Sequence, residues 1–311
     1  MLTVAAMVRE TLYATLRFVS WYLEQGADLI VLCFDDPDDP AIEILQNMDR
    51  LRCVRITLAF LKSVGMTPDR RFVRRQNKCI QKIYHETDSG WFLHVDGDEL
   101  LYLEGRTLKE ELAQTPDDIR GITFLPAELL NTAPASTVSS FRLLMSRPQV
   151  RNIYGDYTRD MRRRSGLIGH TEGKTATRAG FKDASMRQHF LHFEDLLPVV
   201  DRKMGAADGA YLLHFLDQGY DVWRAKLAWR LSARGFSGRL TLRLQEIVDG
   251  ADAEAGLRDV YDVIHRADAA RLAKLDDQGV LFQHDLKIDT LIAHYFPHID
   301  LQRDTMVAYT R

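Results

Sequence analysis

Hydrophobic and polar positions follow an alternating pattern of blocks along the first hundred residues. Apolar runs typical of buried strands are followed by stretches with helical spacing. The helical stretch that begins at Glu10 ends at Gly26, a residue that commonly terminates helices. The predicted strands are residues 2–8, 28–34, 54–59 and 91–95, and the predicted helices are residues 10–25, 40–48 and 76–85. Strands that alternate with helices predict a largely parallel sheet covered by helices, an α/β fold.

The rest of the chain is less regular. Residues 121–125 and 139–145 predict two further strands, whereas residues 147–182 are polar, basic and glycine-containing, which favours long functional loops. From Leu196 the pattern is helical to the end, most clearly at residues 221–231 and 267–275. We therefore expect a second, mainly helical region after the α/β part.

Composition and charge are those of an ordinary globular protein. The 311 residues are 46% hydrophobic and 27% charged, and the net charge of -3 gives no reason to expect a nucleic-acid binder. Cys33, Cys53 and Cys79 match no metal-binding spacing, so we expect free thiols in a reducing compartment. The first residues show no secretory pattern, and no apolar window reaches the roughly 18 residues of a membrane span. These features predict a cytoplasmic protein.

An acidic cluster follows the predicted strand at residues 91–95. The stretch WFLHVDGDELLY places Asp96, Asp98 and Glu99 at the carboxyl end of that strand, where open parallel sheets bind their ligands. Asp96 and Asp98 are two residues apart and would point to the same side of an extended chain. They could therefore hold one Mn²⁺ or Mg²⁺ ion that keeps positions for phosphate oxygens. The alternative is an acidic turn paired with nearby Arg or Lys.

Several segments in order over residues 2–102 resemble the family 2-like branch of glycosyltransferases, which has the Rossmann-like GT-A fold. The segments are VAAMVRE, FVSWYLEQGADLIVLCFDDPDDP, RRQNKCIQKIY and WFLHVDGDELLY. In that branch a strand ends near a basic residue and Glu, a Trp-containing helix follows, the next strand ends in an acidic turn, and an Arg-Gln helix precedes Asp-x-Asp-Glu. The resemblance implies a metal-dependent, inverting transferase that uses a nucleotide-diphosphate sugar.

The resemblance also assigns roles. Asp98 would bind the metal that bridges the diphosphate, and Asp96 would contact the ribose or the water shell of the metal. The sequence has FDDPDD where the branch more often has Asp-Asn-x-Ser-x-Asp, so Asp35 and Asp36 are alternatives beside the nucleoside. The implied nucleotide-sugar-binding residues are Arg9, Glu10, Asp35, Asp36, Arg75, Gln76, Asp96, Lys174 and Arg178.

Two later segments extend the resemblance. Lys174 and Arg178 lie in GHTEGKTATRAG, which resembles a Gly-Lys-(Ser/Thr)-x-x-Arg segment, and their charges could neutralise phosphate oxygens. Their alternative is an exposed position in solvent. His214 lies in YLLHFLDQGYDVWRAK, which resembles the segment that supplies a histidine to the metal, with His189 and His192 as competitors.

An inverting transferase also needs a carboxylate that takes the proton of the acceptor hydroxyl. Glu128 is the first candidate by its place after the acidic strand, Glu172 the second and Asp156 the third. Glu128 could instead be an exposed helix or loop carboxylate. The basic run Arg159–Arg164 suggests a mobile active-site loop with weak peripheral contact to the inner face of a membrane.

The sequence thus predicts a catalytic GT-A domain over residues 1–195 and a mainly helical region over residues 196–311 packed on it. The expected activity is hexosyl or related transfer to a hydroxyl of a glycan, lipid-linked or protein acceptor, as in polysaccharide biosynthesis, with no nucleic-acid partner. One alternative is a nucleotidyltransferase of related fold, although VAAMVRETL lacks the glycine-rich loop usual there. The other is a catalytically inactive nucleotide-sugar-binding protein.

Overall fold

The computed structural model describes residues 1–132, 137–193, 197–217, 219–232 and 235–301. It contains two compact units that are each discontinuous in sequence. The first unit comprises residues 1–125, 173–212 and 287–311, and the second comprises residues 126–172 and 213–286. These boundaries differ from the predicted division into residues 1–195 and 196–311, whose boundary lies outside the described residues.

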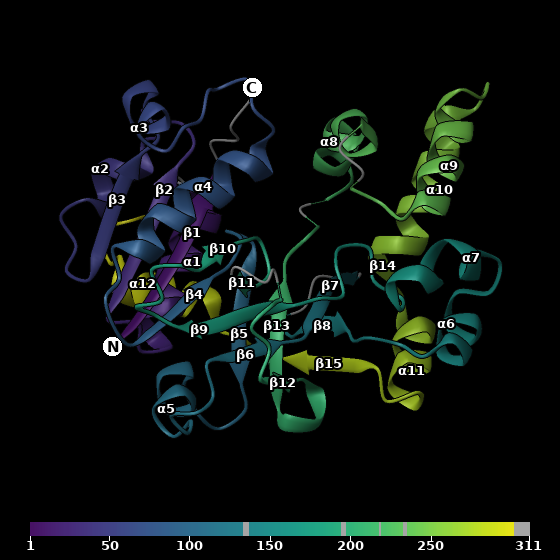
Figure 1. The fold of residues 1–311 in the computed structure, drawn as a ribbon. Helices are drawn as coiled ribbons and strands as arrows, with labels where there is room; N and C mark the ends of the chain where they lie inside the picture. The colour runs from purple at the N-terminus through teal and green to yellow at the C-terminus, as the bar shows by residue number, and fades with distance from the viewer. Residues whose placement is uncertain (133–136, 194–196, 218, 233–234, 302–311) are drawn as a thin grey trace. The chain divides into compact units, whose positions relative to one another are not determined.

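A seven-stranded sheet forms the centre of the first unit, in the order β12-β6-β9-β4-β1-β2-β3 (Figure 1). Strands β4, β1, β2 and β3 are parallel to one another, and β9 is antiparallel to both of its neighbours, β4 and β6. The sheet is therefore mixed, and the predicted α/β class is confirmed. The strand bounds are β1 (Leu2–Val8), β2 (Leu29–Phe34), β3 (Leu51–Arg55), β4 (Trp91–His94), β6 (Gly121–Phe124), β9 (Lys174–Arg178) and β12 (Arg202–Met204).

Helices cover this sheet because its central strands are largely apolar and buried. All seven residues of β1 are buried, which requires packing on both faces of the strand. Helix α4 (Phe72–His85) packs on β1 and β2, and its Ile80 and Ile83 join a core cluster that includes Val31 and Phe92. The other elements of this unit are α1 (Leu12–Glu24), α2 (Ala41–Leu45), α3 (Leu58–Ser63), α5 (Leu108–Ala113), α12 (Ile288–Tyr295), β5 (Glu99–Leu103), β10 (Ser185–Met186) and β11 (Leu191–His192).

The strand predicted over residues 54–59 is half right. Strand β3 ends at Arg55, and helix α3 begins soon after it. The Thr57 side chain accepts a hydrogen bond from Phe60 N at 3.2 Å and so caps this helix. The apolar run alone did not reveal this capping signal.

The second unit contains an antiparallel sheet in the order β15-β8-β7, and β14 pairs with β7 in parallel. Its helices enclose an apolar core that includes Trp223, Leu244, Leu257 and Ile264. The bounds are β7 (Pro126–Thr132), β8 (Ser139–Arg142), β14 (Arg266–Ala267), β15 (Leu281–His284), α6 (Arg147–Tyr154), α7 (Thr158–Met161), α8 (Tyr220–Ser232), α9 (Gly238–Val248), α10 (Ala253–His265) and α11 (Ala269–Asp277). Strand β13 (Ala210–His214) crosses the boundary between the units at residues 212 and 213.

Two predictions about the later chain are wrong. Residues 147–182 form α6, α7, two short 3-10 turns and β9 rather than long loops, and Ser146 N donates to Gln149 Oε1 at 2.7 Å to begin α6. The region after residue 196 is not helical throughout, because β12, β13, β14 and β15 lie within it. These strands have two to five residues, too few to show a clear alternation in sequence. None of the helices in the described ranges is long and apolar enough to cross a membrane.

Candidate functional site

The carboxyl ends of three neighbouring strands bring the predicted site residues of the first unit to one edge of the sheet. Strand β1 leads into Arg9, β2 into Asp35, and β4 into Asp96. Because these strands are parallel, their carboxyl ends meet at the same edge. Lys174 arrives from the other direction: it is the first residue of β9, which runs antiparallel to β4 with Ala176 opposite Leu93.

Asp96 lies at the centre of a hydrogen-bond network. Its carboxylate accepts from Gln76 Nε2 at 2.6 Å and from Lys174 Nζ at 2.9 Å, and its backbone N donates to Glu99 Oε2 at 2.8 Å. The Lys174 ammonium also lies 3.4 Å from Glu99 and donates to Gln188 O at 3.0 Å. The Lys174 and Glu99 side chains are 0% exposed, whereas that of Asp96 is 25% exposed. Asp96 is thus the member of this ion cluster that a ligand can reach.

The ion cluster favours the charged forms of Asp96 and Lys174. Burial is the largest single effect and raises the pKa of Asp96, but the charge of Lys174, the hydrogen bond that Lys174 donates and smaller effects together leave that pKa below its ordinary value. Burial likewise lowers the pKa of Lys174, yet Asp96 and Glu99 together leave it above its ordinary value. The alternative that the sequence left open was an acidic turn paired with nearby Arg or Lys, and Asp96 and Glu99 are indeed paired with Lys174.

A glycine explains why a lysine can enter this cluster from β9. Gly173 has a φ of +77°, and a Cβ atom at this position would lie 2.1 Å from Phe124 O. A residue with a side chain would therefore strain the turn and collide with β6. The turn before Lys174 therefore requires glycine, which explains the Gly-Lys sequence at residues 173 and 174.

Asp35 is the acidic residue of the FDDPDD turn that faces basic side chains. It accepts from Arg75 Nη2 at 2.7 and 3.0 Å, and Arg9 Nη1 lies 3.6 Å away. Asp36 instead accepts from Asp38 N at 3.0 Å and so shapes the turn. The structure thus brings Asp35, and not Asp36, together with Arg75 and with the largely exposed Arg9.

The turn formed by Asp96, Gly97, Asp98 and Glu99 has a second basic neighbour, which was not predicted from the sequence. Arg17 of α1 is buried, which lowers its pKa, while the nearby charges of Tyr13, Asp98 and Glu10 oppose this effect. Glu10 also lies against the turn, because a Cβ atom on Gly97 would be 3.1 Å from Glu10 Cγ. The signal available in the sequence was a charged residue within the apolar stretch LRFVSWYL.

Helix α1 also holds the strand that follows the acidic turn. Tyr22 OH donates to Glu99 O at 3.0 Å and accepts from Leu101 N at 3.2 Å, and Trp21 Nε1 donates to Leu101 O at 2.9 Å. The Trp-containing helix of the resemblance therefore has a definite role here, which is to fix the backbone at Glu99.

Arg178 lies at the opposite edge of the sheet from Lys174. The two residues are the ends of β9, about 13 Å apart at the usual rise per residue. Arg178 donates to the carbonyls of Thr115, Pro116 and Ile119 and lies over the Trp91 ring at 4.5 Å. The prediction that Lys174 and Arg178 lie together at the phosphates is therefore wrong. The two residues are four positions apart on an extended strand, which carries them to opposite edges of the sheet.

Glu128, the first candidate for the base, is fully buried on β7. Its carboxylate accepts from Arg142 at 3.1 and 2.6 Å, from Ile168 N at 2.7 Å and from Gly169 N. Glu128 and Arg142 are opposite each other in β7 and β8, and both side chains are 0% exposed. The sequence alternative of an exposed Glu128 is therefore wrong.

The surroundings of Glu128 suit a structural anion better than a base. Burial is the largest single effect and raises its pKa, but the charges of Arg142 and His214 and the hydrogen bonds from Ile168 N and Arg142 together leave the pKa below its ordinary value. A carboxylate with a lowered pKa and several donors around it accepts a proton poorly. Glu172 and Asp156, the other two candidates, are both exposed.

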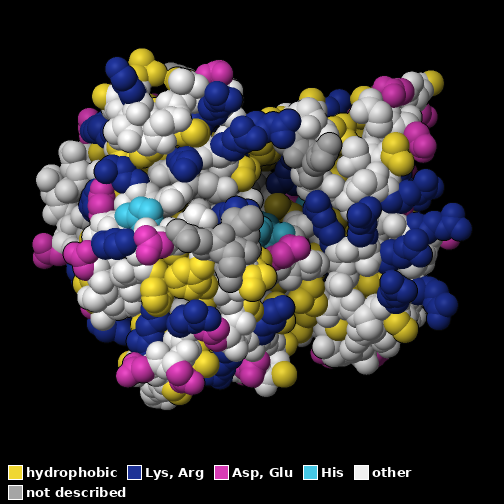
Figure 2. Space-filling model, in the orientation of Figure 1, with side chains coloured by type: hydrophobic (Ala, Val, Ile, Leu, Met, Phe, Trp, Pro, Cys, Tyr) yellow, Lys and Arg dark blue, Asp and Glu magenta, His cyan; other side chains and the backbone are white. Residues whose placement is uncertain are grey.

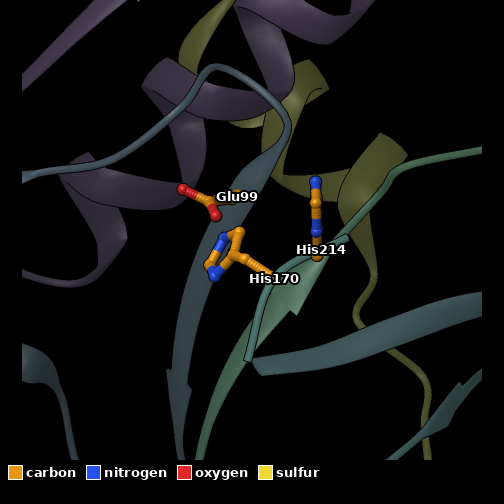
Figure 3. A group of neighbouring side chains, drawn as sticks. All are labelled: Glu99, His170 and His214. Atoms are coloured by element: carbon orange, nitrogen blue, oxygen red, sulfur yellow. The ribbon is translucent and has the colours of Figure 1, made fainter. Parts of the chain in front are cut away.

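Two histidines of the second unit lie near Glu128. The rings of His170 and His214 have their centroids 5.7 Å apart, and Figure 3 shows both side chains. A Cβ atom on Gly169 would lie 2.8 Å from Glu128 Oε1 and 3.0 Å from His214 Cε1, so only glycine fits between these groups. Imidazole nitrogens are common ligands of transition-metal ions such as zinc. That His214 joins Asp96 and Asp98 at one metal ion stays a prediction.

The two competitors of His214 are in the first unit. Nδ1 of His189 lies 2.8 Å from Gly173 O, and His192 belongs to the short strand β11.

Comparison with protein-family models and with curated proteins found no match.

Proposed function

We propose that this protein is a metal-dependent, inverting glycosyltransferase of the GT-A type, which moves a sugar from a nucleotide-diphosphate sugar to a hydroxyl of a glycan, lipid-linked or protein acceptor. The observation that carries the proposal is the clustering of Arg9, Asp35, Asp96 and Lys174 at one edge of the sheet, beside Arg75 and Gln76. This edge is where open α/β sheets bind nucleotides.

Within the first unit the roles follow from exposure and pairing. Asp35 is held by Arg75, and Asp96 by Gln76 and Lys174, so both carboxylates are pre-oriented acceptors for the hydroxyl and N–H groups of a nucleoside. Arg9 has a side chain that is 67% exposed and a fork of donors that suits phosphate oxygens. We assign Arg9 to the diphosphate and leave Arg178 out of the site.

The acidic turn fits a divalent cation by its charge. Four carboxyl groups, those of Glu10, Asp96, Asp98 and Glu99, lie around the turn near two basic groups, Lys174 and Arg17. The carboxyl groups outnumber the basic groups, which favours one Mn²⁺ or Mg²⁺ ion there, and Asp98 is the ligand that we assign. When bound, the ion would stabilise the charge that develops on the leaving diphosphate.

For the base we propose Glu172 in place of Glu128. The Glu172 side chain is exposed, whereas Glu128 is buried and held by Arg142. A base must reach the acceptor hydroxyl, and an exposed carboxylate meets that requirement.

We place this activity in the cytoplasm. Cys33, Cys53 and Cys79 are all free thiols, as expected in a reducing compartment.

A thermal-shift panel tests the proposal. Nucleoside diphosphates of each base are added with Mn²⁺, Mg²⁺ or a chelator, since a ligand at about 100 times its Kd stabilises the folded state by about 2.7 kcal/mol. We expect one diphosphate to raise Tm with metal, and Asp98→Ala to abolish the increase. Asp118→Ala is the matched control, because Asp118 is an exposed residue of the same unit. An absence of stabilisation by every diphosphate under every metal condition refutes the proposal.

A second assay separates the proposed reaction from that of a nucleotidyltransferase. Incubation with the matching nucleotide-sugar is expected to release nucleoside diphosphate, the leaving group, as the sugar passes to an acceptor hydroxyl or, without an acceptor, more slowly to water. Release of pyrophosphate from nucleoside triphosphate and sugar phosphate instead contradicts sugar transfer and assigns the site to nucleotidyl transfer.

A further inference from the structure

Five arginines line one pocket of the second unit. The pocket has a volume of about 730 Å³ and is lined by Arg147, Arg159, Arg162, Arg163 and Arg239, which we call the arginine pocket. All five residues are exposed. Figure 2 shows basic side chains gathered in the part of the view where Figure 1 labels α6 and α7.

The arginine pocket is assembled from three parts of the chain. Arg147 begins α6, and Arg239 lies in the first turn of α9. Arg159, Arg162 and Arg163 come from α7 and the 3-10 turn after it, at a spacing of three and four residues that places them on one side. The basic run in the sequence is therefore not the mobile loop that it suggested but one wall of a pocket.

Contacts on the other side of α7 fix this wall. Asp160 is buried and lies 2.9 Å from Arg243 Nε of α9, and its backbone carbonyl accepts from Ser237 Oγ at 2.9 Å. The Arg243 guanidinium also lies 4.4 Å from the centre of the Tyr157 ring. These contacts hold α7 against α9, so the positions of the pocket arginines are set by packing and not by a ligand.

The charge of the arginine pocket is uncompensated. Among the residues that the structure describes, no acidic side chain lines the pocket, and none of its five arginines forms an ion pair. The nearest acidic residue on α7, Asp160, is already paired with Arg243. Like charges held together in a concave site repel one another and attract anions.

We propose that the arginine pocket binds a small ligand that carries two or more phosphate groups. Arginine forks match phosphate oxygens, and the volume falls in the range of about 300–1,000 Å³ usual for small-molecule sites. A concave site favours a compact polyanion over a flat lipid surface. The proposal concerns the second unit alone and does not rest on the transferase function, whose nucleotide residues lie in the first unit.

Isothermal titration with inorganic triphosphate tests this site in the full-length protein. A chelator is present throughout, so that metal-dependent diphosphate binding does not contribute. We expect binding that weakens with salt and an affinity about tenfold lower, or lower still, in Arg162→Gln/Arg163→Gln, since each tenfold corresponds to about 1.4 kcal/mol. Arg224→Gln/Arg258→Gln is the control, because these exposed arginines of the same unit lie beside Glu254.

A second double variant locates triphosphate binding at the arginine pocket. Arg147→Gln/Arg239→Gln should weaken binding similarly, and thermal melting checks that each variant is folded. Equal affinity in wild type and both pocket variants overturns the proposal, as does an absence of binding at about 0.15 M salt. Sedimentation with anionic and with neutral vesicles tests whether the arginines bind a lipid surface instead. Binding to anionic vesicles without triphosphate binding overturns the proposal.

Discussion

Replacing Lys174 by methionine removes the positive charge from the buried ion cluster of the first unit while keeping a side chain of similar length. In the wild-type protein the ammonium lies 2.9 Å from Asp96 and 3.4 Å from Glu99, and the side chains of Lys174 and Glu99 are fully buried. The substitution leaves two carboxylates close together with no basic partner between them. Breaking a buried ion pair in this way costs about 3–5 kcal/mol. We expect Lys174→Met to lose that much unfolding free energy at pH 7.

The stability difference between wild type and Lys174→Met should also depend on pH. In the wild-type protein the pKa of Asp96 is lowered, so its contribution to stability is present above the pKa of the unfolded chain and is lost as pH falls through the lower folded value. Without Lys174, burial and the neighbouring Glu99 should raise the pKa of Asp96. The mutant therefore regains stability by taking up a proton in acid. We expect the difference between wild type and Lys174→Met to shrink between pH 7 and pH 5.

Urea unfolding at both pH values measures this difference. Tryptophan fluorescence follows the unfolding, and two of the four tryptophans, Trp21 and Trp91, lie in the first unit. Lys182→Met is the control, because Lys182 pairs with exposed Asp88 and its loss should change stability little. A loss below about 1 kcal/mol in Lys174→Met, or a loss that does not depend on pH, refutes the reasoning.

Three further predictions concern other parts of the chain. Glu128→Gln should destabilise the protein by about 3 kcal/mol or more in urea unfolding, because it leaves the buried charge of Arg142 without its partner; unchanged stability contradicts the structural role. Arg75→Gln should abolish stabilisation by the nucleoside diphosphate in thermal-shift assays, whereas Arg178→Gln should retain it, since Arg178 lies at the other edge of the sheet; equal losses contradict the site. With an aromatic disulfide reagent at pH 8, Cys53 should react first, because the other two thiols are buried and burial raises the pKa of Cys53 less, to about 11; release of three equivalents at one rate contradicts this order.

The central strands of the first unit could be read from the sequence. Strands β1, β2 and β4 are covered on both faces, so they appear as uninterrupted apolar runs, and the charged residues after each run mark its carboxyl end. The α/β class and the grouping of Arg9, Asp35 and Asp96 at one edge follow from that pattern. Helix α4 was also predicted, although it begins at Phe72 and not at Gln76.

The pairing of the charged residues was decided by the tertiary structure. Lys174 meets Asp96 because β9 enters the sheet antiparallel between β4 and β6, and the same arrangement carries Arg178 to the opposite edge. Glu128 becomes a buried anion because β8 places Arg142 opposite it. An apolar run reports that a segment is buried, a property of the segment itself. The partner of a charged side chain depends on which strands pair and in which direction, and contacts distant in sequence determine both.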